Sequence, residues 1–480
     1  MLDGTVRIFI AESLILPTGL LTVAFLTRKL GPENYGLYTL AAAIASWLCW
    51  TVTSIYSRAA IKFVSEADNW RPVGAFVLKL SLAAGLGVGL CVFLLAPPLA
   101  QWLKTPTLAP YLQLFSVEIL FVSLANAHKT ILTGLGGFRE RAVISSSHWI
   151  IRLFLIIVFV ELGFSVAGAV MGSVAASLVE LLVSRWYVRP SISGGGKFAI
   201  RQFWSYSLPL LLFVLIMRLF DKVDLFALKA LGRSTAEVGI YAAAQNLTLV
   251  PGIFAFSFST PLLTIVSRLL HSGRTEEAKE LARSAMRVVI ILLPFAGLCV
   301  GAASEIVALI FGESFLPAAP LLSLLIFASL ALVMVSITSA ILTAAGKPGW
   351  TIALTAPVLP FALGGYILLI PHFGALGAAM VTTSIAILDS FAAVLLVYWL
   401  WHILPPFASL WRSILVGFIT FALATFWQAE GFWLLFKLSA IGSIIVCLYL
   451  LLGEFKAKDI ALVRSTFWRQ TGTNQNPNNT

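Results

Sequence analysis

Apolar runs of about 18 or more residues recur along the whole chain, and they constrain its fold more than any other feature. Each run is long enough to cross a hydrocarbon core of about 30 Å as a helix. Hydrophobic residues make up 59% of the 480 residues and charged residues only 11%, whereas about a quarter of the residues in soluble proteins are charged. The runs are continuous rather than alternating, which excludes a membrane β-barrel. The sequence therefore predicts an all-α polytopic membrane protein.

About fourteen transmembrane helices can be placed by length and apolar character. They fall near residues 5–27, 37–60, 74–100, 110–133, 142–162, 166–187, 205–230, 237–265, 285–311, 318–343, 350–370, 375–401, 410–428 and 433–452. Lys and Arg gather in alternate short loops, which places those loops and both termini in the cytoplasm. The net charge of +11 is therefore assigned to membrane topology and not to a nucleic-acid partner.

Three short patterns recur in the same order roughly 200–210 residues apart, as expected for a duplicated chain. The matched pairs are Leu30-Gly31…Gly36-Leu37-Tyr38 with Leu231-Gly232…Gly239-Ile240-Tyr241, Ile131-Leu132-Thr133 with Ile341-Leu342-Thr343, and Phe164…Gly168-Ala169 with Phe373…Gly377-Ala378. The first six spans thus correspond to the next six. Since six is even, both copies insert in the same orientation, as a parallel repeat.

The repeat and a Gly/Ser-rich segment after Pro190 define the predicted domain organisation. The expected parts are an N-lobe (1–190), a cytoplasmic linker (191–200), a C-lobe (201–404), two additional transmembrane helices (405–455) and a cytoplasmic tail (456–480) with a disordered end. Glu12 and the absence of a small-residue cleavage site argue that the N-terminal apolar stretch is a retained span and not a signal peptide.

Charged residues inside these spans are the candidate functional residues, because each one costs roughly 2.5–3.5 kcal/mol at the centre of a lipid-exposed helix. Arg218, Asp221, Lys222 and Asp224 lie within one short stretch of the seventh span. They must face a polar cavity, lie near the end of the span, or pair with one another. The last alternative, in which two acids and two bases neutralise each other on one helix, stays open.

Four more charged residues lie in other spans. Arg152 lies inside the fifth span, Arg58 near the inner end of the second, and Glu12 and Asp389 near the middle of the first and twelfth. Arg152 and Arg218 could instead form structural ion pairs with an acid of another helix, such as Glu118, Glu161 or Glu180. Arg58 could extend to the lipid headgroups.

Several segments resemble a known transporter family. They are similar to segments of the Wzx-type polysaccharide-biosynthesis flippases, which belong to the multidrug/oligosaccharidyl-lipid/polysaccharide exporter superfamily. The segments are LTRKLGPENYGLYTLAAAI, RLFDKVDLFALKALGRSTAEVGIYAAAQNL, LIFGESFLPAAPLL, ILTAAGKPGW and IPHFGALGAAM. The resemblance extends over about residues 5–450. It implies two six-helix lobes around a cationic cavity and the transfer of undecaprenyl-pyrophosphate-linked oligosaccharide across the bacterial inner membrane, coupled to H⁺ or Na⁺ in several members.

The predicted function is therefore that of a flippase working by alternating access. Cations must offset the pyrophosphate charge, and intramembrane acids are the expected ion-coupling groups. The substrate-binding candidates are Arg58, Arg152, Arg218 and Lys222, and the ion-coupling candidates are Glu12, Asp221, Asp224 and Asp389. The expected partners are the lipid-linked oligosaccharide, membrane lipid, a coupling ion, and polysaccharide polymerase or assembly proteins.

No catalytic residue, metal site or cofactor is expected. The sequence lacks a Gly-rich phosphate loop, HExxH and GxSxG, and its four cysteines have no CxxC spacing. Two alternatives remain. A multidrug/cation antiporter of the same superfamily would rely on cavity acids, and a membrane glycosyltransferase or polymerase would need a sizeable loop with catalytic side chains.

Overall fold

The computed structural model describes residues 14–191, 200–208, 222–355 and 357–454. These ranges are helical with short connections and contain no strand, which confirms the predicted all-α fold. Three candidate residues lie outside the described residues, namely Glu12, Arg218 and Asp221. Most of the predicted linker and the tail after Glu454 also lie outside them. The chain forms two compact units: the first comprises Met1–Val250, Ile310–Leu321 and Val358–Thr382, and the second comprises Pro251–Leu309, Leu322–Pro357 and Thr383–Thr480. The predicted lobe boundaries stay a prediction.

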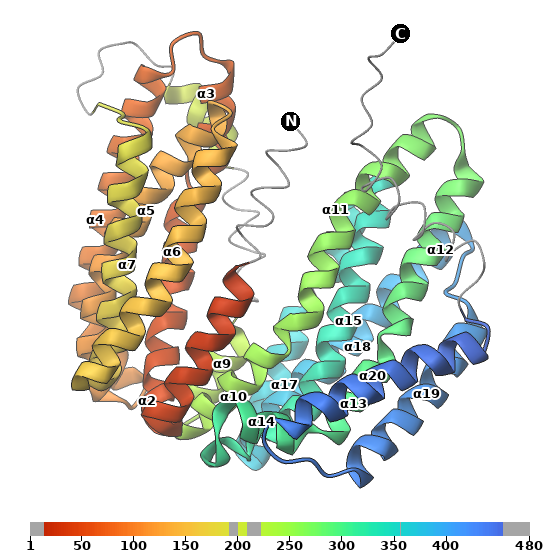
Figure 1. Ribbon diagram of the computed structural model, residues 1–480. Coiled ribbons are helices and arrows are strands. Elements are labelled where there is room, and N and C mark those ends of the chain that lie inside the picture. The colour runs from red at the N-terminus through yellow and green to blue at the C-terminus, as the bar shows by residue number, and fades with distance from the viewer. Residues whose placement is uncertain (1–13, 192–199, 209–221, 356, 455–480) are drawn as a thin grey trace, which may run out of the picture. The chain divides into compact units, whose positions relative to one another are not determined.

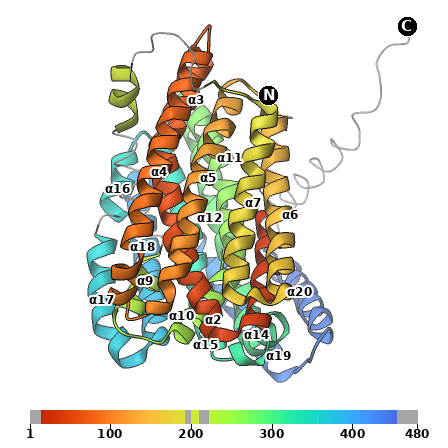
Figure 2. The ribbon, with the colours of Figure 1, turned by 90° about the vertical axis from the view of Figure 1, so that its left-hand side faces the viewer.

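The first unit is a helix bundle. Its helices are α2 (Ile15–Ser54), α3 (Ser57–Glu66), α4 (Arg71–Trp102), α5 (Ala109–Gly134), α6 (Phe138–Phe159), α7 (Ser165–Tyr187), α9 (Val223–Ala230), α10 (Thr235–Leu247) and α17 (Val358–Phe373). Figures 1 and 2 show α4, α5, α6 and α7 side by side, and α5 packs against both α4 and α7. The start of α10 packs against α2.

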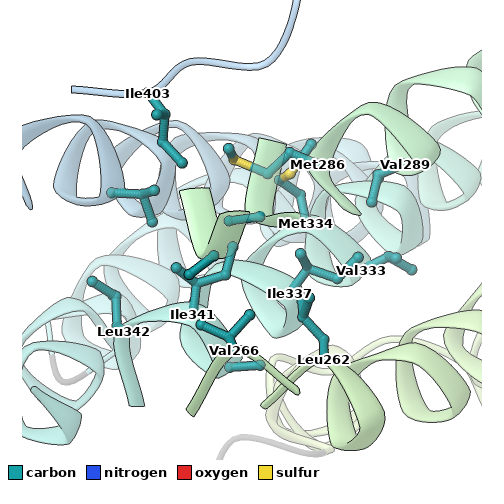
Figure 3. Close-up of a cluster of buried hydrophobic side chains, with 14 of the residues drawn as sticks. Leu262, Val266, Met286, Val289, Val333, Met334, Ile337, Ile341, Leu342 and Ile403 are labelled. Carbon is teal, nitrogen blue, oxygen red and sulfur yellow. The ribbon is translucent and has the colours of Figure 1, made fainter. Parts of the chain in front are cut away.

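The second unit is built mainly from α11 (Leu249–His271), α12 (Thr275–Ile291), α13 (Leu293–Gly301), α14 (Ala303–Phe311), α15 (Ala318–Ala344), α16 (Pro348–Thr355), α18 (Ala375–Trp401), α19 (Phe407–Phe426) and α20 (Trp433–Leu451). Its core brings together Val266 of α11, Met286 of α12 and Ile337 and Ile341 of α15, with Ile403 from the segment after α18 (Figure 3).

Nine helices within the described ranges are long and apolar enough to cross a membrane. Two of them, Ile15–Glu66 and Phe138–Tyr187, contain 52 and 50 residues, more than twice the roughly 20 residues that one crossing needs. Each is interrupted by a glycine with positive φ, Gly31 at 71° and Gly163 at 94°. A positive φ interrupts the α-helix, and non-glycine residues rarely adopt it. Each glycine therefore divides its long helix into two crossings, in agreement with the predicted first and second spans and the predicted fifth and sixth.

Two segments matched by the sequence repeat meet backbone to backbone in the first unit. A Cβ atom on Gly36 would lie 2.0 Å from the carbonyl oxygen of Thr235, and a Cβ atom on Gly239 would lie 2.2 Å from the carbonyl oxygen of Pro32. The contact is reciprocal, since Gly36 and Gly239 occupy the same position in the two copies. The absence of side chains at both positions allows this close approach.

Helices α19 and α20 are attached to the second unit through ion pairs near their ends. Lys437 of α20 is fully buried and pairs with Glu305 of α14, which also accepts from the backbone N–H of Ala429 at 3.0 Å. At the other end of α20, buried Glu454 pairs with Arg287 at 2.7 Å and Arg412 at 2.9 Å. Burial raises the pKa of the Glu454 carboxyl, but hydrogen bonds from Ser409 and the two arginines bring it below its ordinary value.

Replacing either contact glycine by alanine should destabilise the protein. Gly36→Ala and Gly239→Ala force the two backbone segments apart, and overpacking of this kind costs about 1–3 kcal/mol. We expect a lower thermal unfolding midpoint for both purified variants in detergent micelles. Gly87→Ala in α4 is the matched control, because nothing lies within 4 Å of its Cβ position and alanine favours a helix over glycine. Equal midpoints for the three variants would contradict the proposed contact.

Candidate functional site

Two buried polar clusters occupy repeat-related positions in the first unit. Tyr38 and Tyr241 each follow the contact glycines Gly36 and Gly239 by two residues. Ser173 and Thr382 each follow the matched Phe164 and Phe373 by nine residues. The duplication therefore supplies one tyrosine and one hydroxyl residue to each cluster, and the two clusters differ in the charged residue that joins them.

The first cluster is centred on Arg152 of α6. Its Nε donates to Ser173 Oγ at 3.3 Å and its Nη2 donates to Tyr38 OH at 3.4 Å. The guanidinium carbon also lies 5.8 Å from the centroid of the Trp149 ring. These contacts come from α2, α6 and α7 and use only two of the five N–H groups of an arginine.

The acids considered as ion-pair partners of Arg152 have other contacts. Glu118 accepts from Ser177 Oγ at 3.1 Å. Glu161 pairs with Lys29 at 2.7 Å, where both side chains are half exposed. Glu180 lies 2.6 Å from Lys129 Nζ and 3.2 Å from His148 Nδ1. Hydroxyl groups are the hydrogen-bond partners of Arg152 within the described part of the chain. Glu118 and Glu180 interact with it only as nearby charges.

The second cluster is centred on buried Asp224 of α9. Its carboxylate accepts from Tyr241 OH at 2.8 Å, from the Leu225 backbone N–H at 2.8 Å, and from the side-chain amide of Gln245. Thr382 Oγ1 lies 3.2 Å from Tyr241 OH and 3.0 Å from Tyr366 OH. The cluster therefore joins α9, α10, α17 and α18 through an acid surrounded by hydroxyl and amide groups.

Lys222 lies at the exposed edge of the second cluster. Its Nζ donates to Gln245 Oε1 at 3.4 Å, and that side chain in turn donates to Asp224. Lys222 and Asp224 thus share a hydrogen-bonding partner. Arg218 and Asp221, the other two charges of this stretch, lie outside the described residues, so their neutralisation by neighbours stays a prediction.

The remaining candidates lie apart from the two clusters. Arg58 of α3 is exposed, and Lys62, one turn later, has its ammonium 4.4 Å from the Tyr206 ring centroid. Asp389 of α18 belongs to the second unit, where its side chain is 9% exposed. Its Oδ1 atom is buried without a hydrogen-bond partner among the described residues. A buried carboxylate in this state is suited to hold a proton or a cation.

The sequence analysis missed the uncharged members of both clusters. These are Tyr38 and Ser173 in the first cluster, and Tyr241, Gln245, Tyr366 and Thr382 in the second. The repeat could have identified four of them, because the two tyrosines (Tyr38 and Tyr241) and the two hydroxyl residues (Ser173 and Thr382) lie at matched positions. Within the ranges that the structure describes, no group of three or more His, Cys, Asp or Glu residues could hold a metal ion.

The chain resembles known proteins in sequence. Residues 1–268 match the family model described as polysaccharide biosynthesis protein. Two Bacillus subtilis (strain 168) relatives are the uncharacterized membrane protein YabM, 26% identical over 366 residues (69% of this chain, 66% of YabM), and stage V sporulation protein B, 24% identical over 357 residues (65% of this chain, 67% of that protein). The chain thus spans just under two thirds of the length of YabM.

Solved structures share the fold at low sequence identity. The lipid II flippase MurJ in an inward closed conformation matches with a TM-score of 0.77 at 17% identity, over 96% of this chain and 100% of that chain. An inward-facing multidrug resistance MATE transporter of the MOP superfamily matches with a TM-score of 0.61 at 18% identity, over 86% of this chain and 98% of that chain. These likenesses show a shared fold.

The ion pair between Glu180 and Lys129 should contribute to the stability of the first unit. Glu180→Gln leaves Lys129 and His148 beside a neutral amide in a buried position, and breaking a buried pair costs about 3–5 kcal/mol. Glu161→Gln breaks the half-exposed pair with Lys29, where a loss below about 1 kcal/mol is expected. Thermal unfolding of both purified variants in one detergent measures the difference. A midpoint for Glu180→Gln no lower than that for Glu161→Gln would contradict the assignment.

Proposed function

Because the chain belongs to the polysaccharide biosynthesis protein family, we propose that it is a flippase for lipid-linked oligosaccharide. It moves undecaprenyl-pyrophosphate-linked glycan from the inner to the outer leaflet of the bacterial cytoplasmic membrane by alternating access, with both termini in the cytoplasm. The observation that carries this proposal is Arg152, a cation inside a helix bundle whose hydrogen bonds go to hydroxyl groups. These bonds use only two of its five N–H groups, so the others can donate to an anionic substrate.

The chemistry of the cargo explains why such a residue is needed. A glycan cannot cross hydrocarbon without losing its hydrogen bonds to water, so it needs a polar path. A pyrophosphate needs donors that offset its charge, and guanidinium groups bind phosphate oxygens in a bidentate manner. Arg58, Arg152, Arg218 and Lys222 serve as these donors in the proposed mechanism.

Ion coupling in the proposed mechanism relies on acids inside the spans. Asp224 has Tyr241, Thr382 and Gln245 around it, all of which carry oxygen atoms, and oxygen ligands suit hard cations. Protonation or Na⁺ binding would remove the cost of a buried negative charge and change the hydrogen bonds between α9 and α10. Glu12, Asp221 and Asp389 are further coupling candidates.

A second candidate function is a cation antiporter of the same superfamily. The buried Asp224 cluster is the observation that favours it, because an acid inside a span is suited to pair with a cationic substrate. A glycosyltransferase has less support, because neither of the connections 103–105 and 135–137 is long enough to hold a catalytic loop. Ethidium uptake into energised proteoliposomes separates the antiporter from the flippase.

Neutralising a proposed pyrophosphate-binding residue should slow transport strongly. The protein is reconstituted into liposomes with an undecaprenyl-pyrophosphate trisaccharide carrying a fluorescent NBD group on the sugar, and dithionite quenches the label in the outer leaflet. Wild-type protein should expose nearly all the label. Arg152→Ala and Arg218→Ala should each slow quenching about 10–100-fold, because a charge-assisted hydrogen bond contributes about 1.5–3 kcal/mol.

Arg274→Ala is the matched control for that assay, because Arg274 is exposed and pairs with Glu277 outside both clusters. It should transport at the wild-type rate. Quenching by the wild-type protein that equals that of empty liposomes would reject the flippase proposal. Wild-type rates in Arg152→Ala would reject the role of this arginine alone.

Removing the charge of Asp224 should uncouple transport from an ion gradient. Asp224→Asn keeps the size of the side chain but cannot exchange a proton or balance the charge of Na⁺. In the same assay, imposed pH and Na⁺ gradients should accelerate the wild-type protein and leave Asp224→Asn unchanged. Asp68→Asn, at an exposed acid, is the matched control. An equal response of Asp224→Asn and the wild-type protein would exclude Asp224 as a coupling residue.

A further inference from the structure

A pocket of 340 Å³ lies in the first unit, away from the two polar clusters. It is formed where the start of α10, the start of α15 and the turn between α17 and α18 meet. Its polar side chains are Arg233, Glu237 and His372, and Phe373, Pro317 and Pro320 contribute much of its apolar lining. The volume is near the lower end of the range of about 300–1,000 Å³ that is usual for small-molecule sites.

The polar side chains of the pocket are held in place by the helix ends around it. Arg233 donates from Nε to the Ile370 carbonyl at 3.1 Å and from Nη2 to the Ile370 and Pro371 carbonyls at 2.6 Å each. These carbonyls belong to the last turn of α17; the Ile370 carbonyl also accepts from the Gly374 backbone N–H at 2.8 Å, and Arg233 supplies further donors at this helix end. Arg233 therefore caps α17 and keeps a fixed position beside the pocket.

Glu237 is the acceptor of the pocket. Its Oε2 atom is buried, lies 3.9 Å from Arg233 Nε, and accepts no hydrogen bond from the described residues. Gly374 faces this oxygen with a φ of +60°, and a Cβ atom there would lie 2.8 Å from it. A glycine at this position thus allows the backbone to pass close to this buried oxygen, while the Glu237 side chain as a whole stays 36% exposed and can accept from a ligand.

The lining combines features that suit an uncharged, hydroxyl-rich ligand. Arg233 and Glu237 offset each other in charge, so neither a free anion nor a free cation is strongly favoured. A carboxylate accepts from hydroxyl groups, and imidazole both accepts and donates. The Phe373 ring is 53% exposed, and the electron-rich face of an aromatic ring attracts the polarised C–H groups of a sugar.

We propose that this pocket binds one or two sugar units of the transported glycan. The proposal rests on the proposed function and adds a second binding site for the same substrate. In the predicted orientation, the loops before α10 and α15 and the turn after α17 are at the outward ends of their spans. The pocket is then an exit site, which holds the glycan headgroup after it has crossed and while the lipid is released into the outer leaflet.

Binding of soluble disaccharides to the purified protein tests the pocket without requiring transport. The full chain is placed in lipid nanodiscs and mixed separately with maltose, cellobiose and N,N′-diacetylchitobiose. Saturation-transfer difference NMR then detects weak binding and identifies the ring protons in contact. At least one disaccharide should bind, and Glu237→Ala and Phe373→Ala should each weaken it by about tenfold or more, as expected for the loss of one charge-assisted hydrogen bond or one aromatic contact.

Two matched controls distinguish the pocket from general effects. Glu313→Ala removes an exposed acid from the short helix Glu313–Phe315, and Phe361→Ala removes a ring of α17 that is 73% exposed; neither residue lines the pocket. Both should bind like the wild type. The proposal is overturned if no disaccharide binds the wild type, or if binding survives in Glu237→Ala and Phe373→Ala. Wild-type protein that flips the labelled lipid but binds no disaccharide would reject the exit site and leave the flippase function standing.

Discussion

The close approach of Gly36 to Thr235 and of Gly239 to Pro32 brings two repeat-related segments together in the first unit. It requires a residue without a side chain at the same position in both copies, and it brings two helix starts into backbone contact. Tyr38 and Tyr241 follow two residues later on these helices, and each one is buried in a polar cluster of its own copy. One packing contact therefore orients the two clusters, which is why a methyl group at either glycine would affect more than local packing.

The two clusters also show how a duplicated framework can acquire opposite charges. Each keeps a tyrosine hydroxyl and a Ser or Thr hydroxyl, but the first adds Arg152 and the second adds Asp224. Hydroxyl groups can donate or accept, so they satisfy either charge without cancelling it. A buried ion pair would have neutralised both. The two clusters therefore differ in the sign of their central charged side chain, Arg152 in the first and Asp224 in the second.

Sequence reasoning captured the features that depend on length and composition. Apolar length and turn glycines predicted the all-α fold, the two crossings of α2 and of the α6–α7 segment, and the extra pair α19 and α20. The roles of Arg152 and Asp224 stay predictions. The partners did not follow. Glu180 pairs with Lys129 and His148 rather than with Arg152, and that choice depends on helix rotation. In α18 and α20, which are apolar on nearly every side, periodicity carries little information about which face is buried.

Helices α19 and α20 are attached by close packing and polar contacts, because the hydrophobic effect does not drive helices together inside lipid. Lipid chains are as apolar as Leu or Phe, so helices associate there through close packing and polar contacts. A Cβ atom on Gly297 of α13 would lie 2.4 Å from the carbonyl oxygen of Gly417 of α19, and Thr420 donates to the Pro294 carbonyl at 3.0 Å. The ion pairs of Lys437 and Glu454 add a polar anchor toward each end of α20. Since these contacts involve α12, α13 and α14, the added pair must move with those helices during any transport cycle.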